Sequence, residues 1–263
     1  MENEIHDYKF EVDDSAKLNV KNIRGKIDIK KGIDNVIKIQ VIKYPETGND
    51  EETKIIVHQE SDSTVEAKVN FDGKDFLRVR RPCRIEFIIE VPANCQVNAK
   101  NVSGDVILDN VDGDHRLGTV SGSIRFSNVK ADVFASKSVS GGVLGDNLVC
   151  KTAEIKSVSG SVILSEMAID EMDLSTVSGS IKYNGALGSG RHDIGSVSGS
   201  INLKIPGKTN LDFKASSISG KLNSDLNIKF TSISKRSWAG KLNDGGALIK
   251  LKTISGSMNI NTL

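Results

Sequence analysis

The sequence predicts an all-β protein: a β-solenoid, similar to a parallel β-helix, with about 19 residues and two strands per coil, plus an irregular N-terminal antiparallel β cap. Three observations predict this fold. A tripeptide recurs at nearly fixed spacing, apolar and polar residues alternate strictly between its copies, and the 263 residues include 24 glycines but only 4 prolines. We find no convincing helical periodicity in the chain.

The tripeptide Val/Ile-Ser-Gly is the internal repeat. Its copies begin at Val102, Val120, Val139, Val158, Val177, Val197, Ile218 and Ile254, which are 18, 19, 19, 19, 20, 21 and 36 residues apart. The last interval is close to two periods, and we expect a degenerate copy within it, at Trp238–Leu242. Ile23–Ile29 fits the same pattern, so a first copy is expected far upstream. Because one coil cannot bury its apolar face alone, serial copies predict stacked coils.

Each period divides into two expected strands of about seven residues, joined by turns such as Ser127-Asn128. Apolar or small residues alternate with polar ones, which is the pattern of a strand with one buried face. In one period, the residues expected to face the core are Val120, Gly122, Ile124, Phe126, Val129, Ala131, Val133 and Ala135. The intervening residues, including Phe134, are expected to face solvent.

A small residue recurs at the third position of each strand, most often the glycine of the tripeptide. Glycine weakens a strand, so its recurrence indicates either a close approach of another backbone or a bulge. Cys150 takes this small position, which favours a core residue over a reactive thiol. The cysteines, Cys83, Cys95 and Cys150, are odd in number and lack metal-like spacing, so we expect reduced thiols.

The repeat pattern suggests two regions, an N-terminal β cap over residues 1–98 and a solenoid over residues 99–263. The cap contains a polar loop at Tyr44–Thr53 and alternating strands at Val65–Val69 and Ile85–Val91. Solenoids need atypical ends, because an open final coil would present bare strand edges.

Charge and hydropathy limit the function classes. Lysine plus arginine number 35 against 34 aspartates and glutamates, so nothing indicates a nucleic-acid partner. The N-terminus has neither a basic start nor an apolar run, and no stretch approaches the roughly 18 apolar residues of a membrane helix. We therefore expect a cytoplasmic protein, with peripheral association with a membrane as an alternative.

The sequence contains no recognisable catalytic group. The four histidines are scattered without ligand spacing, so a zinc site is not expected. Gly188–Asp193 lies where one period lengthens, and it lacks the Gly-Lys-Ser/Thr of a phosphate loop. Outward charges form no carboxylate cluster of the kind that polysaccharide-cleaving solenoids use. We expect no enzyme activity, no cofactor and no metal.

Hydroxyl side chains around the tripeptide form one candidate interaction surface. Its expected members are Ser121, Ser123, Ser140, Ser159, Ser161, Ser178, Ser180, Ser198 and Ser200. The residues that precede the tripeptide are expected on the same face, namely Thr119, Ser138, Ser157, Thr176 and Ser196. A flat row of small hydroxyls could bind glycan, ordered water or another protein. The alternative is a solvated sheet face, or one that packs beneath the N-terminal domain.

A basic cluster around Pro82 is the second candidate surface, formed by Arg78, Arg80, Arg81 and Arg84. Such a cluster could dock on anionic lipid headgroups or on an acidic partner. Cationic residues and proline also protect an exposed edge strand from unwanted pairing, which is their commoner use.

The segment Ile85–Val106, IEFIIEVPANCQVNAKNVSGDV, followed by serial copies of TVSGSI, resembles a bacterial β-strand-repeat family known as "putative adhesins", a domain of unknown function. The resemblance extends from about Leu18 to the end of the chain, and the Val91-Pro92 step is among its features. It implies a solenoid-like β fold and a role in envelope-stress signalling or at the cell surface. It supplies no catalytic residues, and the adhesin label implies export, for which this chain shows no signal.

Together these observations predict a non-enzymatic scaffold or binding module that acts through its repeat surface in the bacterial envelope-stress response, with a protein as its partner. Two alternatives stay open. One is a surface adhesin, and the other is a structural protein that self-assembles into a filament by end-to-end stacking of coils. The polar stretch Gly256–Leu263 offers little capping, which keeps the filament open as an alternative.

Overall fold

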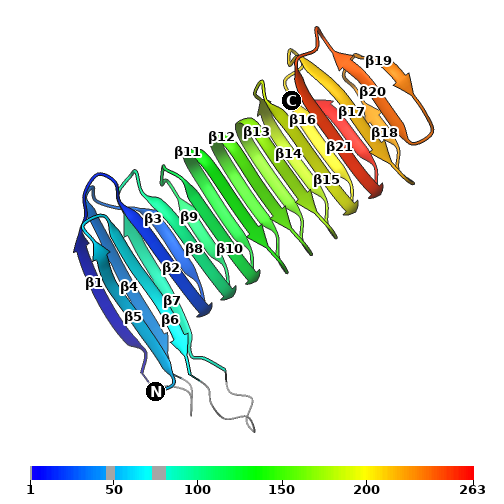
Figure 1. Cartoon of the computed structure of the whole chain (residues 1–263). Helices are drawn as coiled ribbons and strands as arrows, with labels where there is room; N and C mark the ends of the chain where they lie inside the picture. The colour runs from blue at the N-terminus through cyan, green and yellow to red at the C-terminus, as the bar shows by residue number, and fades with distance from the viewer. Residues whose placement is uncertain (1, 46–50, 73–80) are drawn as a thin grey trace. The chain divides into compact units, whose positions relative to one another are not determined.

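The computed structural model describes residues 2–45, 51–72 and 81–263. These residues form strands, turns and bends, and no helix occurs within them (Figure 1). The all-β solenoid expected from the sequence is confirmed. The chain forms two compact units, Met1–Val129 and Lys130–Leu263, with one strand running across the division. The division into a cap over 1–98 and a solenoid over 99–263 stays a prediction.

The first unit consists of consecutive coils and an antiparallel cap. Its strands are β1 (Glu4–Glu11), β2 (Lys17–Arg24), β3 (Ile27–Lys31), β4 (Val36–Tyr44), β5 (Thr53–Ser61), β6 (Thr64–Phe71), β7 (Arg84–Val91), β8 (Gln96–Ser103), β9 (Val106–Asp109), β10 (His115–Ser121) and the start of β11 (Ile124–Ser138).

The upstream copy of the repeat is a coil of the stack. Its strands β2 and β3 pair in parallel with β8 and β9, so that Leu18 lies beside Val97 and Ile27 beside Val106. On the far side of β8 and β9, the strands β10 and β11 continue the stack in parallel. Two segments about 80 residues apart in sequence are therefore neighbouring coils, as the shared motif predicted.

The cap begins on the other face of this upstream coil. Strands β6 and β7 pair in parallel with β2 and β3, as a further coil would. The next strands reverse direction, because β5 pairs antiparallel with β6, β4 with β7, and β1 with β4. The expected antiparallel cap is confirmed, and among the described residues β1 and β5 are its edge strands.

The second unit contains the more regular coils. Its strands are the rest of β11, β12 (Val143–Ser157), β13 (Val162–Thr176), β14 (Ile181–Leu187), β15 (Arg191–Ser198), β16 (Ile201–Ile205), β17 (Leu211–Ser217), β18 (Leu222–Ser224), β19 (Ile228–Ile233), β20 (Ser237–Leu242), β21 (Ala247–Ser255) and β22 (Met258–Thr262). Strand β13 pairs with β12 on one side and with β14 and β15, which are successive strands of one coil, on the other (Figure 1). Strand β16 lies beside β14.

Equivalent residues of successive coils stack into columns. Val143 pairs with Val162, Val162 with Ile181, and Ile181 with Ile201, and each of these side chains is fully buried. Parallel neighbours lie about 4.8 Å apart, so each column is a continuous apolar stack. Burial of these columns is the main stabilising contribution that a coil receives from its neighbours.

The alternation of buried and exposed residues shifts phase within a coil, which corrects part of the expected core. In β11, Phe134 is fully buried whereas Val133 is 38% exposed, the reverse of the expectation. The valine of the tripeptide is also exposed, at 46% for Val120. The chain bends at residues such as Asn128, whose left-handed φ of 53° interrupts the strict period of two. Strict alternation holds only along a straight strand.

The C-terminal strands are not last in the spatial order. Strand β21 lies between β15 and β17, and β22 lies between β16 and β18. Beyond β17 the chain forms a hairpin, in which β20 pairs antiparallel with both β17 and β19. Trp238–Leu242 is therefore a strand of this hairpin, and the expectation of a degenerate coil was wrong. Gly256–Leu263 lies inside the stack, so the expectation that it leaves the end uncapped was wrong as well.

Candidate binding surfaces

The glycine of the tripeptide is required by the neighbouring coil. A Cβ on Gly160 would clash with the carbonyl group of Gly141, and one on Gly179 would clash with that of Gly160. In the first unit, Gly122 has the same relation to Gly104. Of the two explanations that the sequence allowed, the structure supports close approach, and the approaching backbone belongs to the adjacent coil.

The residue before the tripeptide binds the same carbonyl. Thr176 Oγ1 donates to Gly160 O at 2.8 Å, and Ser157 Oγ donates to Gly141 O at 2.9 Å. All five residues expected on the outer face at this position are buried: Thr119, Ser138, Ser157, Thr176 and Ser196. That expectation was therefore wrong. A buried carbonyl needs a donor, and these hydroxyls supply it from inside the coil.

The exposed residue of the motif is the valine. One such side chain projects from every coil of the second unit, and we call this row the valine rib. In stacking order its members are Val139, Val158, Val177, Val197, Ile254 and Ile218, which are 44, 44, 48, 40, 42 and 57% exposed. The backbone beneath the rib is paired, since Ser178 N donates to Val158 O at 2.8 Å. The rib is thus a rigid apolar line with a spacing of one coil.

The predicted serines separate into two rows next to the rib. The exposed row, which we call the serine row, contains Ser140, Ser159, Ser178 and Ser198, and its counterpart in the first unit is Ser121. The half-buried serines that follow the glycine are Ser161, Ser180 and Ser200, with Ser123 in the first unit. Our sequence reasoning missed the valine rib, because it assigned the valine to the core. The turn-forming Ser-Gly that follows each valine was a signal that the strand ends there.

The basic cluster is described only in part, because Arg78 and Arg80 lie outside the described residues. Arg81 and Arg84 are exposed. Arg84 forms an ion pair with Glu86 and lies 4.8 Å above the ring of Tyr44. It opens β7, which is paired on both sides, so Arg84 does not protect an edge strand.

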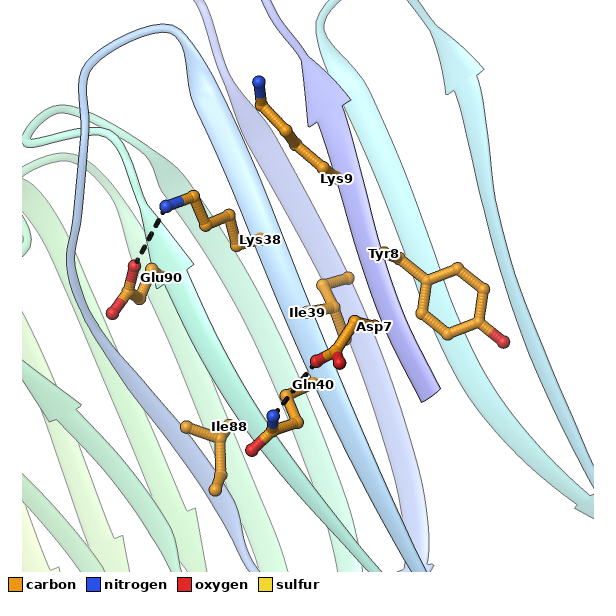
Figure 2. A pocket seen from close by; sticks show the side chains of 8 residues that line it. All are labelled: Asp7, Tyr8, Lys9, Lys38, Ile39, Gln40, Ile88 and Glu90. Atoms are coloured by element: carbon orange, nitrogen blue, oxygen red, sulfur yellow. Dashed lines mark hydrogen bonds and ion pairs between the residues drawn. The ribbon is translucent and has the colours of Figure 1, made fainter. Parts of the chain in front are cut away.

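A shallow groove crosses β1, β4 and β7 on the outer face of the cap (Figure 2). It encloses about 410 Å³. Gln40 Nε2 donates to Asp7 Oδ1 at 3.0 Å, and Lys38 Nζ lies 3.9 Å from Glu90. Ile88 adds an apolar contact surface, whereas Tyr8 points away from these polar groups. The groove could hold a small polar group, but Gln40 and Asp7, and Lys38 and Glu90, already interact with one another.

The titratable side chains in the described parts of the chain form no recognisable catalytic arrangement. His115 and His192 are fully buried, and their Nε2 atoms lie 2.9 and 3.1 Å from Val111 O and Gly188 O. Burial lowers the pKa of both rings, for His115 to about 4, and raises the pKa of Cys150 to about 12. These groups are neutral at pH 7 and support the turns and the core.

One cluster of the described residues has the atom spacing of a metal site, His58, Glu60 and Glu66. Lys68 Nζ lies 2.7 Å from Glu66 Oε2 and holds the pKa of that carboxyl below its usual range. Lys21 lies 3.7 Å from the other carboxylate oxygen. The two ammonium groups already neutralise the carboxylate, which leaves little attraction for a cation. Within the described ranges, no helix is long and apolar enough to cross a membrane.

Several solved structures are similar to this chain at low identity. A "putative adhesin" from Parabacteroides merdae is 13% identical with a TM-score of 0.44, covering 98% of this chain and 96% of that one. A "putative lipid binding protein" from Parabacteroides distasonis is 12% identical with a TM-score of 0.43, covering 98% and 96%. A "putative cell adhesion protein" from Clostridium sporogenes is 13% identical with a TM-score of 0.32, covering 99% and 100%.

The family comparison is more informative than the single structures. No curated protein matches the chain. The profile of the Toastrack DUF4097 family, a domain of unknown function, matches residues 16–261. This span includes every copy of the Val/Ile-Ser-Gly repeat and every strand of the cap except β1. The chain therefore belongs to the Toastrack DUF4097 family.

Proposed function

We propose that this protein is a non-enzymatic binding module whose docking surface is the valine rib and the serine row of the second unit. The observation that supports the proposal is the exposure of six β-branched side chains, one per coil, each at least 40% exposed. Contiguous apolar side chains at a protein surface are typical of interaction sites. Their backbone is already hydrogen-bonded, so a partner meets a preformed surface with little ordering cost.

The chemistry of the two rows favours a protein partner. An extended partner chain that lies along the rib would cover one valine or isoleucine of the rib per coil. The polar groups of the partner would then lie over the hydroxyls of Ser159 and Ser178. Burial of apolar surface contributes roughly 25 cal/mol per Å², so a row of six side chains can provide useful affinity. Within this proposal the partner is an envelope-stress component, as the family resemblance implies, and the protein acts in the cytoplasm or at the membrane surface.

Affinity capture from soluble and membrane fractions of the source cell, with identification by mass spectrometry, tests the proposal. We expect a specific protein partner that Val158→Lys combined with Val177→Lys no longer captures. Ser159→Lys combined with Ser178→Lys should weaken the same capture. The matched control is Thr152→Lys combined with Ala168→Lys, which adds the same charge at exposed residues elsewhere on the same coils. Equal capture by the rib variants and the control would contradict the docking surface.

Cellular location separates this proposal from a surface adhesin. Fractionation of the source cell with protease treatment of intact cells should leave the protein protected. Digestion at the cell exterior would favour the adhesin instead.

A further inference from the structure

We propose that copies of this protein associate head to tail, with edge strand β19 of one copy paired to edge strand β1 of the next. The inference is independent of the proposed docking function, because it uses neither the valine rib nor the serine row. It rests on two unpaired strand edges, their exposed apolar side chains and their opposite charges.

Each compact unit has an edge strand of this kind. Among the described residues, β19 pairs with β20 alone and β1 with β4 alone. The shorter β18 and the strand β5 are also paired on one side only, and Gln59 of β5 donates to the carbonyl of Glu11 at one end of β1. The outer N–H and C=O groups of such strands can pair with another strand. The six residues of β19 and the eight of β1 are long enough for a ladder of backbone hydrogen bonds.

The edge strands expose large apolar side chains. In β19, Phe230 is 42% exposed and Ile233 is 65% exposed, and every residue after the first is exposed. In β1, Ile5 is 57% exposed, and the rings of Tyr8 and Phe10 stack with centroids 6.4 Å apart on the other face. An exposed apolar edge strand is the feature that monomeric β-proteins usually avoid. Pairing of the two edges would place these side chains beside those of the partner strand on the same face of the extended sheet.

The hairpin that contains β19 is basic. Its residues 226–243 carry the cations Lys229, Lys235, Arg236 and Lys241 and no acidic side chain, and the exposed Asp225 and Asp244 flank this segment. All four are exposed, and Lys241 Nζ lies 3.7 Å from Asp212.

The segment that contains β1 is acidic. Residues 2–14 carry a single lysine, Lys9, against six acidic residues, which are Glu2, Glu4, Asp7, Glu11, Asp13 and Asp14. Five of these six are exposed, the exception being Glu4, which lies 3.6 Å from Lys43.

These charges select which edges can pair. Two copies of β19 would bring Lys229 and the neighbouring cations of the hairpin near one another, and two copies of β1 would oppose acidic residues. Only the mixed pair brings opposite charges together, which favours association and steers the encounter. Lysine on an edge strand also disfavours pairing with another basic edge, so Lys229 favours the acidic edge β1 as the partner of β19. A pair between two different surfaces leaves one free edge at each end and can therefore repeat from copy to copy.

Sedimentation velocity across a wide concentration range tests the proposal with the full chain. At low salt we expect the average mass to rise with concentration, and at about 0.5 M salt to fall toward the monomer, because screening weakens exposed charge pairs. Lys229→Glu with Arg236→Glu, or Asp7→Lys with Glu11→Lys, should each weaken association about tenfold or more. The matched control is Lys182→Glu with Lys204→Glu, which reverses two exposed lysines on β14 and β16 and should change nothing.

Mixing the two reversed variants guards against misfolding as the cause of lost association. Each alone should be monomeric, whereas the mixture should associate again, because one offers two acidic edges and the other two basic edges. Carbodiimide cross-linking of an isotopically mixed wild-type sample should join Lys229 to acidic residues of β1 in another copy. A wild-type protein that stays monomeric at low salt, or a mixture that does not associate, would overturn the inference. Monomers that bind anionic phosphatidylserine vesicles through Lys229 and Arg236 would instead assign the hairpin to a membrane surface.

Discussion

Single residues of the Toastrack repeat have separate roles that their shared motif conceals. The hydroxyl of Thr176 donates to the carbonyl of Gly160, and Gly160 lacks a side chain because the carbonyl of Gly141 occupies that space. The valine that follows the hydroxyl residue is exposed, as at Val177. The hydroxyl residue and the glycine of the recurring motif therefore hold adjacent coils together, whereas the valine faces outward.

Gly160→Ala should destabilise the protein by about 2 kcal/mol or more, since overpacking against backbone cannot be relieved by a side-chain rotation. Urea denaturation followed by circular dichroism measures the change. Gly195→Ala is the matched control, because its nearest neighbouring atom, Lys252 O, would lie 3.7 Å from the new Cβ. The control should be neutral or slightly stabilising. Equal destabilisation by both substitutions would contradict the proposed close approach.

His115 should make stability depend on pH between about 4 and 6.5. Burial lowers its pKa in the folded state to about 4, against an ordinary value of about 6.5. Between these values the unfolded chain binds more protons, so the free energy of unfolding falls as the pH is lowered. Urea titrations from pH 7.5 to pH 4 check this, with the expected loss on the order of a few kcal/mol.

His115→Gln keeps a donor for Val111 O but cannot titrate, so its pH dependence over this window should be flatter. His192 contributes in the same direction, because burial lowers its pKa as well. The carboxyls of Asp112 and Asp114 near His115 oppose the effect of burial without cancelling it. A variant with the same pH profile as the wild type would show that His115 is not the responsible group.

At the scale of structural elements, the corner of each coil determines where a strand bends. Asn110 and Asn128 adopt left-handed φ values of 56° and 53° in the first unit, and Asn147 adopts 52° in the second. Asparagine tolerates this conformation better than most residues. Glu166 occupies the equivalent corner position in the next coil, with a φ of 57°. Because glutamate disfavours the left-handed conformation more than asparagine does, Glu166 carries more backbone strain.

Glu166→Asn should stabilise the second unit by about 0.5–1 kcal/mol, because it relieves the cost of a left-handed glutamate. The change is measured as an increase in the urea midpoint. Glu171→Asn, an exposed glutamate of the same strand without a left-handed φ, is the control and should have no such effect. A destabilised Glu166→Asn protein would show that its side chain makes a contact that outweighs the strain.

At the scale of the whole molecule, each unit ends its stack in the same way, with strands that reverse direction. In the first unit β5 and β4 reverse beyond β6 and β7, and in the second β20 reverses beyond β17. In both units a coil distant in sequence is inserted before the reversal. The ends are thereby tied to the interior by strands from elsewhere in the chain.

A chain truncated after Gly246 should lose more than its last coil. It lacks β21 and β22, which separate β15 and β16 from β17 and β18. Hydrogen exchange should therefore show loss of amide protection throughout Leu211–Leu242 as well. Replacing Asn227–Lys241 by a short glycine-serine linker removes only the hairpin and should preserve protection in β21 and β22. Retained protection of Leu211–Ser217 in the truncated chain would contradict this arrangement.

The sequence alone determined the repeat, the coil length and the solenoid class, because every coil must bury the same columns, such as Val143 to Ile201. The tertiary structure decided which side chains are exposed. Val120 and Phe134 lie on the faces opposite to those expected because the backbone bends, and an alternation of apolar and polar residues in the sequence does not reveal where a strand bends. It also decided the order of the coils. Nothing in the local sequence of Trp238–Leu242 or Gly256–Leu263 distinguishes a terminal strand from an inserted one. Strand order depends on pairing between segments that are distant in sequence, because equivalent strand edges present the same backbone groups to any partner.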